Sequence, residues 1–273
     1  MPGSLSPDSH RTLLTLDQNG PLGTIEILHP AGTFAPTPAT LIAVEAIAEK
    51  RALLSGTGLD WGSGVGCLAI AAARIETVGS ITGLEISSEN LVAAQRNAAR
   101  NGVAHKTAFL LSESFSPLRE DDRKFLDALR GQTDFILANV PSSEGDDGFG
   151  YRRIVLRGAR DFLCPDGVVF LNVSYQYGAD RVRLLTEACP SFVWDGILAS
   201  TDWVPFDLSR PDLLQCLQAY AQEEQRGGLA YTFPCPEGPQ EKRLSAREAL
   251  ARFQKTGQNP WTKWQVHLFR FRT

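Results

Sequence analysis

The sequence is short of several features that define large classes of protein. Its five cysteines are odd in number and form no C-x-x-C pair, which argues against zinc and favours the reduced thiols of a cytoplasmic protein. No run of about 18 apolar residues occurs, so we expect no membrane-spanning helix. Residues 1–20 have neither the basic start nor the apolar run of a targeting segment. We therefore expect a cytoplasmic protein without a metal site.

The chain also lacks an excess of positive charge and any internal repeat. Its 27 basic residues stand against 31 acidic ones, for a formal net charge of −4, so no broad attraction to nucleic acid is encoded. The length of 273 residues, 43% of them hydrophobic, is enough for one large core with an appended subdomain.

Strand-like and helix-like segments alternate from residue 57 onward. The predicted strands are 57–61, 80–85, 107–111, 133–138, 167–174, 192–198 and 264–271. The predicted helices between them are 66–75, 88–100, 118–130, 150–163 and 179–188. This alternation favours an α/β fold with a seven-stranded, Rossmann-like, doubly wound and mostly parallel sheet. We expect the last strand to be antiparallel and a helical insertion to precede it.

Four segments follow from these patterns. Residues 1–56 form an N-terminal lead-in with a short strand at 24–28 and a helix over 39–52, and residues 57–200 form the core. Residues 201–263 form the insertion, with one helix opening at Ser209-Arg210-Pro211-Asp212 and a capping box at Ser245-Ala246-Arg247-Glu248. Residues 264–273 form the final strand. The insertion is either a cap over the substrate or a packing appendage.

The most informative stretch runs from Leu59 to Ala71, where a buried strand, a glycine turn and a helix start follow one another. Gly62, Gly64 and Gly66 permit positive φ and let the backbone lie flat against a ligand. The stretch predicts a site for an adenosine-containing cofactor. A tight connection without a ligand is the alternative.

An acidic residue, Glu85, ends the next strand-like segment. A carboxylate at that place can accept hydrogen bonds from both ribose hydroxyls of a nucleoside above the turn. A solvated acid at the start of the following helix is the alternative, and we favour ribose binding.

The order of these motifs resembles that of a known family. The pattern Asp60-x-Gly62-x-Gly64-x-Gly66, then Glu85, then Asn139-Val140-Pro141-Ser142 after a strand, is similar to that of the class I S-adenosylmethionine-dependent methyltransferases. Within the class it resembles the small-domain branch of glutamine and nucleobase N-methyltransferases. The resemblance spans about residues 33–200. It implies an enzyme of this class with S-adenosylmethionine as cofactor.

The resemblance also implies the cofactor site. Asp60 would order the turn and face the methionine part, and Gly62 and Gly64 would contact it through their backbone. Glu85 would bind the ribose. Adenine would lie over Ile86 and near Ser114, where the family often has an aspartate that accepts from the adenine amino group.

The resemblance implies that Asn139 and Pro141 are catalytic residues and that Asn139 also belongs to the cofactor-binding residues. In relatives the asparagine and a following carbonyl accept hydrogen bonds from a planar NH₂ group, and an aromatic residue stacks on it. Here Val140 replaces the first proline and Ser142 replaces the aromatic residue. We expect the methyl acceptor to be a nitrogen, less favourably an oxygen, of a protein, a nucleic acid or a small molecule. A protein or small molecule is favoured over a nucleic acid.

The motif is followed by Glu144, Asp146 and Asp147, any of which could act as a general base or be solvated. Two other functions stay open. One is a partner subunit that binds the cofactor with weak catalysis, motivated by Val140 and Ser142. The other is an NAD(P)-dependent oxidoreductase, although Cys67 occupies the third glycine of G-x-G-x-x-G.

Overall fold

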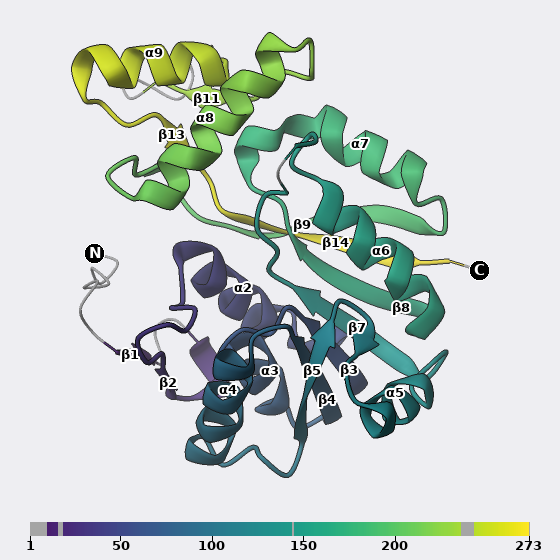
Figure 1. Ribbon diagram of the computed structural model, residues 1–273. Coiled ribbons are helices and arrows are strands. Elements are labelled where there is room, and N and C mark those ends of the chain that lie inside the picture. Colours follow the sequence, from purple (N-terminus) through teal and green to yellow (C-terminus); the bar gives the residue numbers. More distant parts are fainter. Residues whose placement is uncertain (1–9, 16–18, 144, 236–242, 273) are drawn as a thin grey trace.

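One mixed sheet runs through the middle of the molecule, with helices on both faces (Figure 1). A computed structural model describes residues 10–15, 19–143, 145–235 and 243–272. The sheet order is β6-β5-β4-β3-β7-β8-β14-β9. Its strands are β3 (Gly56–Trp61), β4 (Val78–Glu85), β5 (Thr107–Glu113), β6 (Ser116–Pro117), β7 (Thr133–Ala138), β8 (Leu163–Asn172), β9 (Phe192–Ser200) and β14 (Gln265–Phe271).

The strand directions confirm the predicted fold class. β3 is parallel to β4 and β7, β4 is parallel to β5, and β7 is parallel to β8. The last strand, β14, is antiparallel to both β8 and β9. The predicted count of seven strands is one short, because β6 adds a two-residue strand antiparallel to β5. A strand of two residues has no periodicity that a sequence could reveal.

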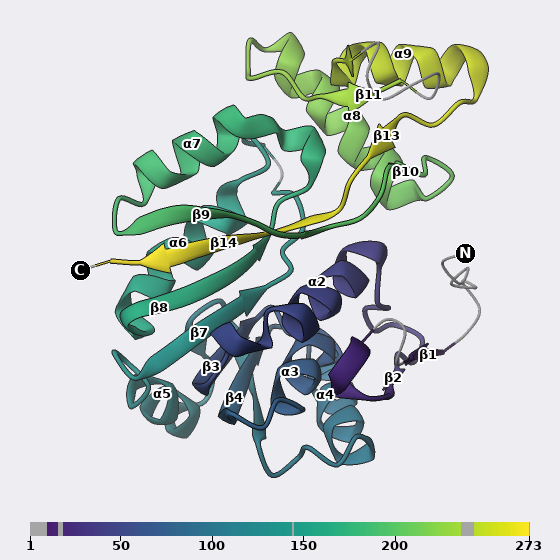
Figure 2. The same cartoon turned by 180° about the vertical axis from the view of Figure 1, so that it is seen from behind.

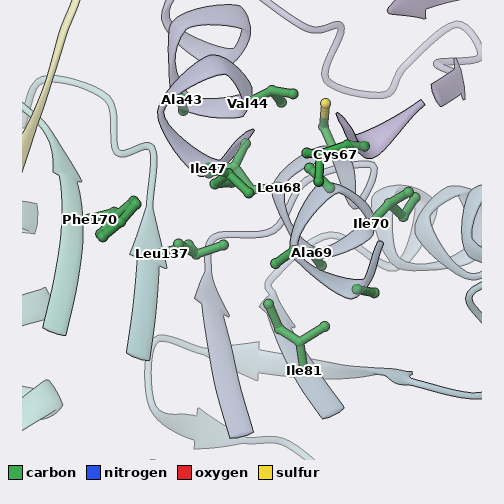
Figure 3. Close-up of a cluster of buried hydrophobic side chains, with 14 of the residues drawn as sticks. Ala43, Val44, Ile47, Cys67, Leu68, Ala69, Ile70, Ile81, Leu137 and Phe170 are labelled. Atoms are coloured by element: carbon green, nitrogen blue, oxygen red, sulfur yellow. The ribbon is translucent and has the colours of Figure 1, made fainter. Parts of the chain in front are cut away.

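Helices cover each face of the sheet, as Figures 1 and 2 show from opposite sides. The first face carries α2 (Pro38–Glu49), α3 (Cys67–Ala73) and α4 (Ser88–Arg100). The second face carries α5 (Glu120–Asp127), α6 (Gly150–Phe162) and α7 (Gly178–Ala188). In Figure 3, α2 and α3 pack apolar side chains towards Ile81, Leu137 and Phe170 of the sheet. Each such side chain contributes about 1.5–3 kcal/mol on burial.

β7 explains why the parallel strands look uniformly apolar in the sequence. Phe135 and Leu137 belong to the core on the first face, whereas Ile136 and Ala138 belong to the core on the second. Successive side chains of a strand point to opposite faces, and helices cover both. Every residue from 135 to 138 is therefore buried.

The sheet order creates a crevice at one place. From β3 the chain passes to β4 and β5 on one side, and it then returns to β7 on the other side of β3. Ligands of open α/β sheets bind where the strand order reverses, at the carboxyl ends of the strands. The glycine turn follows β3 and Asn139 follows β7. The crevice is thus bordered by both predicted motifs.

Two segments differ from the prediction. The lead-in contains β1 (Arg11–Leu14), which pairs antiparallel with β2 (Ile25–Leu28), although we expected no strand before residue 24. β8 begins at Leu163, four residues before the predicted 167, because the strand continues through Asp166 with a positive φ of 64°. Pro165-Asp166-Gly167 is a distortion within a strand and not a turn before one.

The insertion between β9 and β14 folds into a small helical layer that lies beyond α2 in both views (Figures 1 and 2). It consists of β10 (Val204–Pro205), α8 (Pro211–Gln225), β11 (Phe233–Pro234), β12 (Arg243–Leu244), α9 (Ala246–Thr256) and β13 (Trp261–Thr262). The predicted capping box at Ser245 and Glu248 starts α9, and Gly257 ends it in the left-handed region. No helix within the described ranges is long and apolar enough to cross a membrane.

Candidate active site

The glycine turn connects β3 to α3 through three residues with positive φ. The φ angles of Gly62, Gly64 and Gly66 are 68°, 54° and 86°. A Cβ on Gly62 would meet no atom within 4 Å, whereas a Cβ on Gly66 would lie 3.1 Å from Ala94 and Phe109. Gly62 therefore borders open space in which a ligand can contact the backbone of the turn. Gly66 has no room for a side chain because the turn packs against α4 and β5 there.

Glu85 is buried beside this turn. Its Oε2 accepts from the backbone N–H of Gly64 at 2.7 Å, and its Oε1 accepts from Ser87 N at 2.8 Å and Asn90 Nδ2 at 3.3 Å. Only 5% of the residue is exposed, so the alternative of a solvated acid is wrong. A carboxylate has about four acceptor positions, and three are occupied here. Ribose hydroxyls would compete with these donors or use the remaining position.

Asp60 lies beneath the turn, at the end of β3. Its Oδ2 accepts from the N–H of Ala69 at 2.9 Å, which caps the first turn of α3. Burial and the charge of Glu85 raise the pKa of Asp60 to about 7, although the hydrogen bond from Ala69 opposes this. Asp60 thus has the capping role that its position allows, and its cofactor role stays a prediction.

Ile86 directly follows β4 and Ser114 directly follows β5, at the carboxyl ends of these strands. The side chain of Ile86 is 68% exposed, which is unusual for isoleucine and leaves an apolar surface for a flat ring. Ser114 has a positive φ of 56°, and its Oγ accepts from Trp61 Nε1 at 3.0 Å. Among the described residues the Ser114 hydroxyl only accepts, so its hydrogen can be donated to a ligand, which an ionised aspartate at this place could not do.

Asn139 is part of a polar network at the end of β7. Its Nδ2 donates to Thr40 Oγ1 at 3.1 Å, and its Oδ1 accepts from Asn172 Nδ2 at 2.8 Å. Thr40 belongs to α2 and Asn172 ends β8, so the network joins three elements at the crevice. Asn139 was predicted from the sequence, whereas its partner Asn172 was not.

Pro141 belongs to a loop whose backbone is held by Arg152. This buried guanidinium donates to the carbonyls of Asn172 at 2.9 Å, Gly148 at 3.0 Å, Pro141 at 3.3 Å and Val140 at 3.4 Å. Only 2% of Arg152 is exposed. The carbonyls that follow Asn139, one of which the resemblance assigns to binding a planar NH₂ group, are therefore shared with an arginine here.

The acidic loop after the motif is tied to its own surroundings. Asp146 accepts from Ser143 Oγ at 2.6 Å, and Asp147 forms an ion pair with Arg153. Burial opposes ionisation of Asp147, but the hydrogen bonds it accepts outweigh burial and hold its pKa below the ordinary value. Both carboxylates already accept hydrogen bonds from neighbouring groups. Glu144, the third acidic residue named above, lies outside the described residues.

Two cavities meet at Asn139. The turn cavity is bordered by Phe34, Pro36, Thr40, Asp60, Gly62, Ser63, Gly64, Val65, Cys67, Leu68 and Asn139. The roofed cavity, of about 650 Å³, lies between the ends of β7 and β8 and the helix α8. Residues of α8 in its wall are Asp212, Leu213, Gln215, Cys216, Gln218, Ala219, Tyr220 and Gln222. Phe34 and Asn139 border both cavities, which places a shared wall between them.

Comparison with known proteins agrees with this architecture. Residues 30–142 match the family described as ribosomal protein L11 methyltransferase (PrmA). A release factor glutamine methyltransferase of Moorella thermoacetica is 30% identical over 213 residues, which cover 70% of this chain and 71% of that protein. One of Thermodesulfovibrio yellowstonii is 29% identical over 164 residues, covering 55% and 58%. A ribosomal protein L11 methylase structure from Lactobacillus delbrueckii subsp. bulgaricus has a TM-score of 0.50, 22% identity and coverage of 68% and 91%.

The fold, the glycine turn and these matches define the class. The chain belongs to the class I S-adenosylmethionine-dependent methyltransferases. Within that class it belongs to the small-domain branch that includes the release factor glutamine methyltransferases. The chain spans somewhat more than half the length of the Thermodesulfovibrio yellowstonii relative. The assignment sets aside the oxidoreductase alternative.

Proposed function

We propose that this protein transfers a methyl group from S-adenosylmethionine to a nitrogen of a protein side chain. The observation that carries the proposal is that Asn139 borders both the turn cavity and the roofed cavity. A methyl donor beside the glycine turn and an acceptor under α8 would meet at this residue. The names of the relatives, which are glutamine and ribosomal protein methyltransferases, support a protein acceptor.

The donor side is assigned to the predicted cofactor residues. Gly62 and Gly64 would contact the cofactor through their backbone, Glu85 would bind the ribose, and Ile86 and Ser114 would border adenine. Asp60 would keep the turn in place by capping α3. When bound, the cofactor supplies a methyl group already activated on a sulfonium, so this chain has to orient it and exclude water.

The acceptor side is assigned to the loop that carries Asn139 and Pro141. Methyl transfer needs the acceptor nitrogen in line with the methyl group at about 3–3.5 Å. Arg152 fixes the loop carbonyls and thereby the position of Pro141. A neutral nitrogen requires no general base before attack, which agrees with the engaged state of Asp146 and Asp147.

Residues 57–200 would then form the cofactor-binding core and residues 201–263 the cap over the acceptor. The wall that α8 contributes to the roofed cavity supports this division. Ser142 stands where relatives have an aromatic residue that stacks on the acceptor. In this chain α8 would cover the acceptor instead, because it forms part of the wall of the roofed cavity. Acceptors of the translation machinery would be met in the cytoplasm.

Radioactive methyl transfer tests the proposal. The protein is incubated with methyl-labelled S-adenosylmethionine and purified release factor or ribosomal protein L11 of the same cell. We expect label in one of these proteins, at a nitrogen of a side chain, and at least about tenfold less with Asn139→Ala. Cofactor binding without transfer to any acceptor would favour the partner-subunit alternative.

A further inference from the structure

The orientation of the Asn172 amide is fixed by its neighbours. Its Nδ2 donates to the carbonyl of Ala39 at 2.9 Å and to Oδ1 of Asn139 at 2.8 Å. A backbone carbonyl only accepts, so the nitrogen of Asn172 has to face Ala39. Asn139 must then turn its oxygen to Asn172 and its nitrogen to Thr40. Both amide hydrogens of Asn172 are used.

The oxygen of the same amide has no such partner. Asn172 is only 4% exposed and borders the roofed cavity. Among the residues that the structure describes, no group donates a hydrogen bond to Oδ1 of Asn172. This atom is not fully enclosed by protein. Burying a polar acceptor without a hydrogen-bond donor destabilises the protein. The cavity is the direction from which a donor can come.

Gln176 presents the complementary group in the same cavity. It is 1% exposed, and its Oε1 accepts from the buried Thr262 Oγ1 at 2.6 Å. Its backbone carbonyl accepts from Thr232 N at 2.9 Å, which fixes the short helical turn Tyr175–Tyr177. Within the described chain no acceptor contacts Nε2 of Gln176, and the residue borders the roofed cavity. The cavity wall thus offers a free donor and a free acceptor.

We propose that Asn172 Oδ1 and Gln176 Nε2 bind the planar group that carries the acceptor nitrogen. Oδ1 of Asn172 accepts an N–H of that group, and Nε2 of Gln176 donates to its carbonyl oxygen. A carboxamide has both features, whereas a carboxylate has no hydrogen to donate and an ammonium has no oxygen to accept with. Asn139 is then a positioning residue that orients Asn172. The inference rests on the proposed function, whose acceptor site it deepens.

Propionamide is the probe for this pair. The side-chain amide signals of Asn172 and Gln176 are assigned by NMR and followed during titration with propionamide, with and without S-adenosylhomocysteine. Propionate and propylamine serve as controls of similar size. We expect propionamide to move both signals and the two charged probes to leave them in place. Unmoved signals, or equal shifts with propionate, would overturn the proposal.

Two variants extend the test. Asn172→Ala and Gln176→Met each remove one polar group, and Gln225→Ala changes an exposed amide at the end of α8. We expect the first two to weaken propionamide binding by about tenfold or more, with unchanged affinity for S-adenosylhomocysteine, and the third to have no effect. Wild-type propionamide affinity in both site variants would contradict the assignment. Lack of S-adenosylhomocysteine binding in the wild type would instead contradict the proposed function.

Discussion

Oε2 of Glu85 accepts a hydrogen bond of 2.7 Å from the backbone N–H of Gly64, which ties the end of β4 to the glycine turn after β3. The carboxylate therefore helps to shape the turn. The same side chain reaches the start of α4 through Ser87. One residue connects the three elements that border the predicted cofactor site.

Loss of the Glu85 charge is expected to weaken cofactor binding. Glu85→Gln replaces one acceptor oxygen by a donor NH₂ group and leaves either Gly64 or the α4 start without its partner. We expect the dissociation constant for S-adenosylhomocysteine, measured by isothermal titration, to rise about 10–100-fold. Glu113→Gln, an exposed acid at the end of β5, is the matched control and should bind like the wild type. If both variants bind S-adenosylhomocysteine with the same affinity, Glu85 does not contribute to cofactor binding.

Asp60 should make stability depend on pH. Burial raises its pKa in the folded protein from the ordinary 3.8 to about 7, so the folded state binds more protons than the unfolded state between these values. The contribution of Asp60 to the free energy of unfolding is therefore full at low pH and falls as the pH rises towards 7. Asp60→Asn cannot ionise and removes this fall.

Urea denaturation of both proteins at several pH values measures the effect. The stability of Asp60→Asn relative to the wild type should increase between about pH 5 and pH 8. A difference that stays constant over this range would show that Asp60 does not titrate there.

The elements of the core could be predicted because each parallel strand is covered on both faces and each helix on one. β7 and α4 follow these patterns closely, and α4 was predicted with its observed bounds. β6 was missed because two residues are too few for a pattern. β1 was missed because two polar residues and then two leucines follow one another in it, without the alternation that β2 has. Their existence depends on pairing with a neighbouring strand.

The glycine turn and Glu85 could be predicted from their places in the strand pattern. The glycines follow the first strand of the core, and Glu85 ends the next one. Asn172 and Gln176 were missed, because a sequence does not reveal which amide atom is already bonded and which faces a cavity. The one signal available was a polar residue at the carboxyl end of β8, next to Asn139 in the sheet edge.

Arg152 should stabilise the motif loop. Arg152→Met removes the donor to four carbonyls and should lower the free energy of unfolding by about 3 kcal/mol, and methyl transfer should fall with it. Arg160→Met, on the exposed part of the same helix, should change stability by less than about 0.5 kcal/mol. Chemical denaturation compares the two. Equal effects would contradict the role of Arg152.

Arg181 should fix the insertion to the core. It is 1% exposed, pairs with Glu223 of α8 at 3.0 Å and donates to the carbonyls of Leu229 at 2.6 Å and Ala230 at 2.9 Å. Arg181→Met leaves Glu223 without this partner, which should cost about 3–5 kcal/mol. Hydrogen exchange should then become faster in α8 while α4 keeps its protection.

Arg183→Met is the control for this variant. Arg183 lies on the same helix, α7, and forms exposed ion pairs with Asp180 and Glu187. Its loss should leave the exchange rates of α8 unchanged. If both variants exchange like the wild type in α8, Arg181 does not secure the insertion.

In the proposed reaction, donor and acceptor meet at Asn139, between the turn cavity and the roofed cavity. A crystal structure with S-adenosylhomocysteine bound will show whether they do. We predict adenosine beside Glu85 and Ile86, with the sulfur next to Asn139 and facing the roofed cavity. A sulfur that faces away from Asn139, or a ligand that contacts neither the glycine turn nor Glu85, would contradict this arrangement.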